Sequence, residues 1–229
     1  MRRLAALTGL TLMCFSAGLA GQDVAGTTRT VEQLLSGMQA YEQTIEDVRL
    51  EFTQEIEFTS VKEKYVTESI VVFRKPDKLW FEQLSPQVMK IVSNGKKVYV
   101  YNPVTNQVFT DLWKNWKGID YFLPGFFSSK NQVPYLQKYF DITMLDMEGG
   151  SYVMRIVPKK QFEKSKYFPG KFEMYMWVDG KELYPVKGKY VSESVTCVTE
   201  VKSWQINRKP DSSMFEFKAP KDAEYLKLR

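Results

Sequence analysis

Apolar and polar residues alternate along residues 64–113, the stretch around which the rest of the chain is organised. Turn-forming pairs at Ser85-Pro86 and Asn94-Gly95 separate the runs of alternation. A period of two is typical of strands with one buried face, and Asn-Gly supplies the positive φ angles that a two-residue hairpin needs. The stretch therefore predicts antiparallel strands joined by tight turns. The apolar residues that form its buried face are Val71, Phe73, Leu79, Phe81, Met89 and Ile91.

A helix and a long strand are predicted before this stretch. Thr30 and Gln33 have the spacing of a capping box, in which each side chain bonds the backbone N–H of the other residue. Apolar residues then recur at helical spacing, so we predict a helix over about residues 31–46. Residues 48–58 alternate again, with Gln54 as the polar interruption on the apolar parity, and predict a half-buried strand.

Acidic residues on the other face of that strand raise an enzymatic alternative. Glu51, Glu55 and Glu57 share this face, and two carboxylates can serve as acid and base in a glycoside hydrolase. A solvated sheet face explains the same pattern without any chemistry. We favour the solvated face.

The pattern is less regular after residue 112. The aromatic-rich segment 113–127 is broken by glycine and proline, so it predicts either a lid of short helical turns over an apolar face or an ordinary core-packing connection. The lid candidates are Trp113, Trp116, Phe122, Phe126 and Phe127. Further strands are predicted over residues 139–147, 152–157, 171–178, 185–192, 195–206 and 215–220.

The N-terminus has the layout of a secretory signal peptide. Basic residues at Arg2 and Arg3 precede an uncharged apolar run, and small residues stand before a cleavage point after Ala20. Cys14 suggests a lipoprotein, but the residue before it is Met13 and not a small one. We therefore predict a signal peptide over residues 1–20 and a single domain over residues 21–229. Cys197 is then the one remaining cysteine, and we interpret it as a buried core thiol.

Composition narrows the classes of function. The chain has no histidine, which excludes Ser-His-Asp and Cys-His catalysis and every histidine-ligated metal site. We predict no catalytic residue, no cofactor and no metal. The net charge of +5 falls to +3 once Arg2 and Arg3 leave with the signal peptide, an excess that favours solubility and not nucleic-acid binding. The basic segment 159–170 is interpreted as a solvated loop, with contact to anionic headgroups or to a membrane partner as the alternative.

Several motifs in order resemble those of the LolA family of lipoprotein carriers. Phe52-Thr53-Gln54 comes first, and the sequence FRKPDKLWF at residues 73–81 follows it. Next come IVSNGK at residues 91–96 and VYVYNP at residues 98–103. The resemblance covers residues 30–225 and is densest over residues 50–113.

This resemblance implies a fold and a function. The fold would be mainly β with α: an incomplete antiparallel β-barrel of ten to eleven strands, an N-terminal helix and short lid helices. The six residues of the buried face would line a cavity for lipoprotein acyl chains; the alternative is that they form an ordinary filled core. The family's lid latch is an arginine before the proline of the matching strand. Here Lys75 holds that place and Arg74 precedes it, so these two residues are the latch candidates.

The implied protein is a periplasmic monomer that moves lipoproteins from the inner to the outer membrane. Its partners would be an inner-membrane lipoprotein-releasing transporter and an outer-membrane acceptor. Alternatives on the same fold are a carrier or sensor of another lipid or glycolipid, including a LolB-like protein. An integral outer-membrane barrel is disfavoured by the capped helix, the short strands and the basic C-terminus. A periplasmic hydrolase is disfavoured because no nucleophile–base pair is visible.

Overall fold

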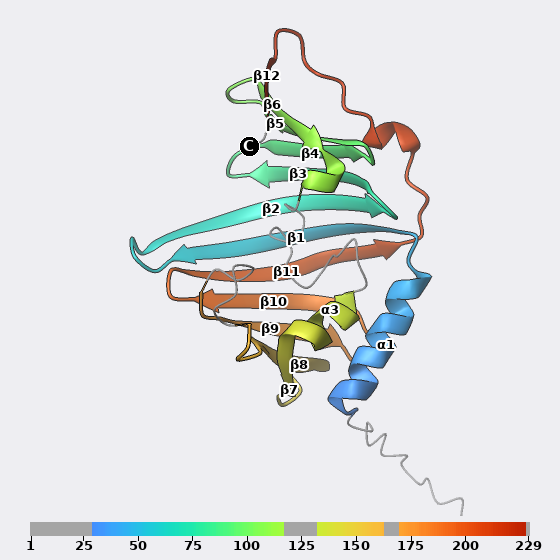
Figure 1. Ribbon diagram of the computed structural model, residues 1–229, viewed down its shortest axis with the longest axis vertical. Helices are drawn as coiled ribbons and strands as arrows, with labels where there is room; N and C mark the ends of the chain where they lie inside the picture. Colours follow the sequence, from blue (N-terminus) through green and yellow to red (C-terminus); the bar gives the residue numbers. More distant parts are fainter. Residues whose placement is uncertain (1–28, 117–131, 163–169, 228–229) are drawn as a thin grey trace, which may run out of the picture.

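The computed structural model describes residues 29–116, 132–162 and 170–227. They form a twelve-stranded sheet in the order β12-β6-β5-β4-β3-β2-β1-β11-β10-β9-β8-β7 (Figure 1). Only the β12–β6 pair is parallel among the described strands. The strands are β1 (Asp47–Phe58), β2 (Glu63–Arg74), β3 (Lys78–Ser85), β4 (Met89–Asn94), β5 (Lys97–Asn102), β6 (Gln107–Leu112), β7 (Phe140–Met144), β8 (Ser151–Pro158), β9 (Phe172–Asp179), β10 (Pro185–Ser192), β11 (Val195–Ile206) and β12 (Glu224–Lys227).

The sheet is open, because β12 and β7 are its two ends and do not pair with each other. This confirms the predicted incomplete barrel, with twelve strands in place of ten to eleven. Neighbours in the sheet are also neighbours along the chain, except where β12 pairs with β6 and where β11 returns to pair with β1 over its whole length. That long pairing joins the two halves of the sheet.

Helices cover one face of the sheet, which we call the inner face; the opposite face is the outer face. Helix α1 (Val31–Thr44) lies beside β7–β10 in Figure 1, and α3 (Gln132–Tyr139) contacts both α1 and β7. The indole N–H of Trp204 on β11 donates to the hydroxyl of Tyr41 at 3.2 Å, which anchors α1 to the sheet. No helix in the described residues is long and apolar enough to cross a membrane.

Two apolar clusters stabilise this arrangement, and burial of each large apolar side chain contributes about 1.5–3 kcal/mol. The first, which we call the β1–β5 cluster, contains Val48, Leu50, Phe52, Val71, Phe73, Leu79, Phe81, Ile91 and Val98. The second, the β7–β10 cluster, joins both helices to the sheet through Leu34, Leu35, Met38, Val133, Leu136, Phe140, Tyr152, Met154, Ile156, Phe172, Met176 and Val178.

The predicted capping box is confirmed at the start of α1. The backbone N–H of Gln33 donates to Thr30 Oγ1 at 3.2 Å, and that of Thr30 donates to Gln33 Oε1 at 2.9 Å. The helix ends at Thr44, two residues before the predicted end. The amide of Asn207 binds the carbonyl oxygen of Thr44 at 2.8 Å, and Ile45 is already extended, so the chain turns there into β1.

The turn between β4 and β5 differs from the predicted form. Gly95 has a positive φ of 91°, whereas Asn94 does not, so the two turn residues are Gly95 and Lys96. Asn94 acts through its side chain instead. Its Oδ1 accepts the backbone N–H groups of Lys96 and Lys97 at 3.0 and 3.1 Å.

The strand predicted over residues 215–220 is wrong. The chain forms a short 3₁₀ helix there, η2 (Ser212–Phe215), and the last strand is β12 instead. The alternation in this segment has another cause: its aromatic residues pack onto the outer face. Phe215 is fully buried, and Phe217 stacks on Tyr99 of β5 at 4.9 Å.

The acidic residues of β1 lie on the outer face, as the solvated-face interpretation requires. Glu55 and Glu57 pair with Lys64 of β2 at 2.9 and 3.6 Å, and all three side chains are about half exposed. Within the described residues no group of His, Cys, Asp or Glu side chains is arranged to hold a metal ion.

Candidate functional site

The structure brings the six predicted wall residues together on the inner face. Cross-strand pairing sets Val71 and Ile91 on either side of Phe81, and Phe73 opposite Leu79. Five of the six are buried members of the β1–β5 cluster, and Met89 packs against it. Their shared parity is therefore as expected. That they line a cavity stays a prediction, since in the structure they pack on one another and on their neighbours.

The lid candidates are only partly within the described residues. Trp113 opens the 3₁₀ helix η1 (Trp113–Asn115), and Trp116 directly follows it. Their rings lie 5.5 Å apart, and both pack against the β1–β5 cluster. Phe122, Phe126 and Phe127 lie outside the described residues, as does most of the basic segment 159–170. Two of the five lid candidates thus pack against the predicted wall residues, and their role as a lid stays a prediction.

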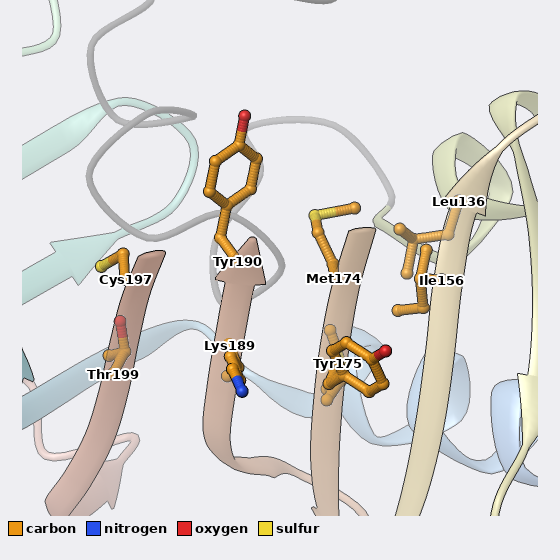
Figure 2. A pocket seen from close by; sticks show the side chains of 10 residues that line it. Leu136, Ile156, Met174, Tyr175, Lys189, Tyr190, Cys197 and Thr199 are labelled. Carbon is orange, nitrogen blue, oxygen red and sulfur yellow. The ribbon is translucent and has the colours of Figure 1, made fainter. Parts of the chain in front are cut away.

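A pocket opens on the other half of the inner face (Figure 2). Its lining residues come from α3 and from β8 to β11. The empty space among them is about 420 Å³ when open solvent is counted, and the cavity itself is about 20 Å³. Figure 2 shows Cys197, Tyr190 and Met174 on three neighbouring strands, with Leu136 and Ile156 to one side. The remaining lining residues are Tyr175, Met176, Gly188, Lys189 and Thr199. None of the six predicted wall residues lines this pocket.

The chemistry of this pocket is that of a neutral apolar site. Burial raises the pKa of the Cys197 thiol, so it is protonated at neutral pH and is a poor nucleophile. Burial likewise raises the pKa of the Tyr190 phenol. Met174 and Met176 supply flexible, polarisable side chains that adapt to irregular apolar shapes. Gly188, directly between Thr199 and Met176 in the sheet, leaves space where another residue would place a side chain. Lys189 is the one charged residue among the described lining residues, and its strand parity is opposite to that of Tyr190, so the pocket suits a hydrocarbon chain.

The sequence matches the family described as "Outer membrane lipoprotein carrier protein LolA" over residues 43–218. The chain belongs to the LolA family. The matched range begins just before β1 and ends after η2, so it includes the whole sheet except β12. No curated protein matches the sequence.

The solved structures that this LolA-family chain is similar to have low sequence identity to it. An uncharacterized conserved protein from Thermus thermophilus has 13% identity and a TM-score of 0.51, with 87% of this chain and 100% of that chain covered. A LolA superfamily protein from Nitrosomonas europaea has 10% identity and a TM-score of 0.40, with 82% and 98% covered. The lipoprotein LppX from Mycobacterium tuberculosis has 11% identity and a TM-score of 0.48, with 78% and 99% covered. At 13% identity, the likeness to the Thermus thermophilus protein shows the fold alone.

The two latch candidates point to different parts of the LolA fold. Arg74 Nη1 donates to the carbonyl oxygen of Pro210 at 3.3 Å, and its guanidinium lies 4.8 Å from the centre of the Phe215 ring, on the outer face. Lys75 Nζ donates to the carbonyl oxygen of Glu42 at 2.7 Å, in the last turn of α1. In the described residues Lys75 thus holds the N-terminal helix, and Arg74 holds the C-terminal segment.

Sequence reasoning identified the strands of the LolA pocket but not its lining residues. Phe172, Met174, Met176 and Val178 alternate as clearly as the predicted wall does. The motifs that resemble the family are densest in the first half of the chain, so the predicted cavity wall lies there and not on these strands. Only the pairing of β8 with β9, of β9 with β10 and of β10 with β11 shows that these residues lie near Thr199 and Cys197.

Proposed function

We propose that this LolA-family protein is a periplasmic carrier that binds lipoprotein acyl chains in an apolar site and moves lipoproteins from the inner to the outer membrane. One observation carries the proposal: the inner face of an open sheet bears a pocket with flexible apolar walls between α3 and β11. Membership of a family described as lipoprotein carriers supports the choice of cargo. Export by a cleaved signal peptide belongs to the same proposal.

The energetics of the cargo explain why such a site is needed. Each methylene group removed from water contributes about 0.8 kcal/mol, so two or three long acyl chains amount to some tens of kcal/mol. A lipoprotein cannot cross an aqueous compartment with that surface exposed. The carrier must provide an apolar surface and later release the load, and neither step requires a covalent reaction. We accordingly expect no catalytic activity.

A charge placed in the pocket tests the proposal. Met174→Glu puts a carboxylate on the inner face, where it must lose its hydration when an acyl chain enters, so binding should fall at least tenfold. The purified protein is incubated with a synthetic S-diacylglyceryl-cysteine peptide, and the bound fraction is measured by co-elution. Leu79 is less suitable for this purpose: it is 2% exposed, and a carboxylate there would unfold the protein.

Thr143→Glu is the matched control, since it adds the same charge outside the pocket. Thr143 is exposed on β7 and has the opposite parity to Ile142 and Met144, which pack against the β7–β10 cluster, so its side chain belongs to the outer face. This variant should bind the peptide as the wild type does. If the Met174→Glu variant binds the peptide as tightly as the wild type, the pocket is not the site for acyl chains. If the wild type does not bind the peptide, the proposal itself is refuted. Mass spectrometry of co-purifying lipids would distinguish lipoproteins from another lipid or glycolipid as cargo.

A further inference from the structure

A band of polar side chains crosses the inner face between the two apolar clusters. Thr199 on β11, Gln54 on β1 and Thr67 on β2 are direct cross-strand neighbours. Ser69 follows on the same face of β2, opposite Phe52 of the β1–β5 cluster. Neighbouring strands lie about 4.8 Å apart, so these four side chains form a continuous group. We call it the polar band.

One half of the polar band is hydrogen-bonded within the sheet. Gln54 Nε2 donates to Thr199 Oγ1 at 3.0 Å and lies 3.8 Å from Cys197 Sγ. Thr199 and Cys197 also line the pocket. The polar band therefore begins at the edge of the pocket and extends from there toward the β1–β5 cluster.

The other half consists of two buried hydroxyl groups that have no hydrogen-bond partner among the described residues. Thr67 is 7% exposed and Ser69 is 3% exposed, and neither Oγ1 of Thr67 nor Oγ of Ser69 has a hydrogen-bond partner in the described part of the chain. A buried polar group without a partner costs about 1–3 kcal/mol, and such groups are rare. Valine and alanine would occupy these positions without that cost. Two such hydroxyls, adjacent on one face, require an explanation.

We propose that Thr67 and Ser69 bind the ester carbonyl oxygens of a lipid, at the point where its glyceryl group joins its acyl chains. This inference rests on the proposed function and names the part of the ligand that the polar band recognises. A hydroxyl donates a hydrogen bond to a carbonyl oxygen. The four side chains of the polar band are neutral, so they suit an uncharged acceptor better than a phosphate or carboxylate.

The position of the polar band fits such a ligand. One apolar cluster lies on each side of it: the β7–β10 cluster with its pocket, and the β1–β5 cluster. A diacylglyceryl group has two esters at its centre and an apolar chain leading away from each. With the esters on Thr67 and Ser69, at least one chain would run past Thr199 into the pocket. The hydroxyls would then fix the depth at which the cargo binds.

Two nearly isosteric variants test the inference, Thr67→Val and Ser69→Ala, alone and combined. The probes are a synthetic S-diacylglyceryl-cysteine peptide and its S-dialkylglyceryl counterpart, in which ether oxygens replace both esters. The wild type should bind the diester about tenfold more tightly than the diether for each hydrogen bond made. The double variant should lose that preference while its affinity for the diether is unchanged. Its urea midpoint should equal or exceed that of the wild type, since the unpaired hydroxyls are gone.

Thr53→Val is the matched control, because Thr53 precedes Gln54 on β1 and lies on the outer face. It should leave both affinities as in the wild type. The inference is overturned if the wild type binds diester and diether equally, or if the double variant loses affinity for both alike. These results leave lipid binding itself intact. If the wild type binds neither peptide, the proposed function fails and the inference fails with it.

Discussion

Arg74 and Lys75 show how adjacent residues at the end of one strand serve opposite faces of the sheet. Side chains alternate along a strand, so only one of the two can point inward. Arg74 reaches the C-terminal segment through Pro210 and Ser212. Lys75 reaches the end of α1 through the carbonyl oxygen of Glu42. A helix C-terminus leaves carbonyl groups without intrahelical partners, and a cation there is favourable.

Exchanging each of these cations for methionine should loosen one segment and not the other. Lys75→Met should speed hydrogen exchange in the last turn of α1, because the carbonyl oxygen of Glu42 loses one of its two donors and keeps only the N–H of Ile45 at 3.3 Å. Arg74→Met should speed exchange in residues 210–216 instead, because it removes two hydrogen bonds and the contact with Phe215. Each variant is the control for the other, and mass-spectrometric exchange measures both. Faster exchange of the same segment in the two variants would contradict the assignment.

Single residues also show which features of the proposed site the sequence alone predicts and which it does not. Gln54 was recognisable from the sequence as a polar interruption on an apolar parity, and its partner Thr199 explains it. Thr67 and Ser69 gave no such signal, since small hydroxyl residues are common in strands. They become candidates for a ligand site only because the strand register sets Thr67 opposite Gln54, and because both hydroxyl groups are buried without a partner in the described part of the chain.

Among the elements, the C-terminal segment is the one for which the sequence pattern predicted the wrong secondary structure. The pattern Phe215-Glu216-Phe217 alternates like a strand, yet these residues have no strand partner among the described strands and pack across β3 to β5. Alternation indicates which side chains lie on the same face of the chain. It does not indicate whether the backbone is hydrogen-bonded to a neighbouring strand. By contrast, α1 was predictable because its capping box depends on residues three positions apart.

Truncation of Phe215 should show that this segment is part of the core. Phe215 is fully buried, so Phe215→Ala should lower the free energy of unfolding by about 3–5 kcal/mol. Phe217→Ala is the comparison: its ring is half-buried and stacks on Tyr99, so its loss should be nearer to about 1 kcal/mol. Urea denaturation measures both. Equal losses of the free energy of unfolding would mean that burial of Phe215 in η2 stabilises the protein no more than the stacking of Phe217 on Tyr99 does.

At the scale of the whole molecule, the sheet has two halves that meet at β1 and β11. Each half was predictable as a series of hairpins, because most neighbours in the sheet are also neighbours along the chain. The junction was not, since Val48 pairs with Ile206 far along the sequence and no local signal specifies that register. The polar band crosses this junction from Thr199 to Thr67. The ligand site that we propose is therefore a property of the assembled sheet and of neither half alone.

Because the site extends over both halves, bound lipid should stabilise the entire sheet. A ligand that binds only the folded state raises its stability by about 2.7 kcal/mol when present at a hundred times its dissociation constant. We expect the urea midpoint of the purified protein to fall when co-purified lipid is extracted. Adding the S-diacylglyceryl-cysteine peptide back should restore it. The Met174→Glu variant should unfold at one midpoint with and without the peptide, because its pocket no longer admits an acyl chain. If extraction and addition leave the wild-type midpoint unchanged, the interior of the sheet does not serve as the binding site for lipid.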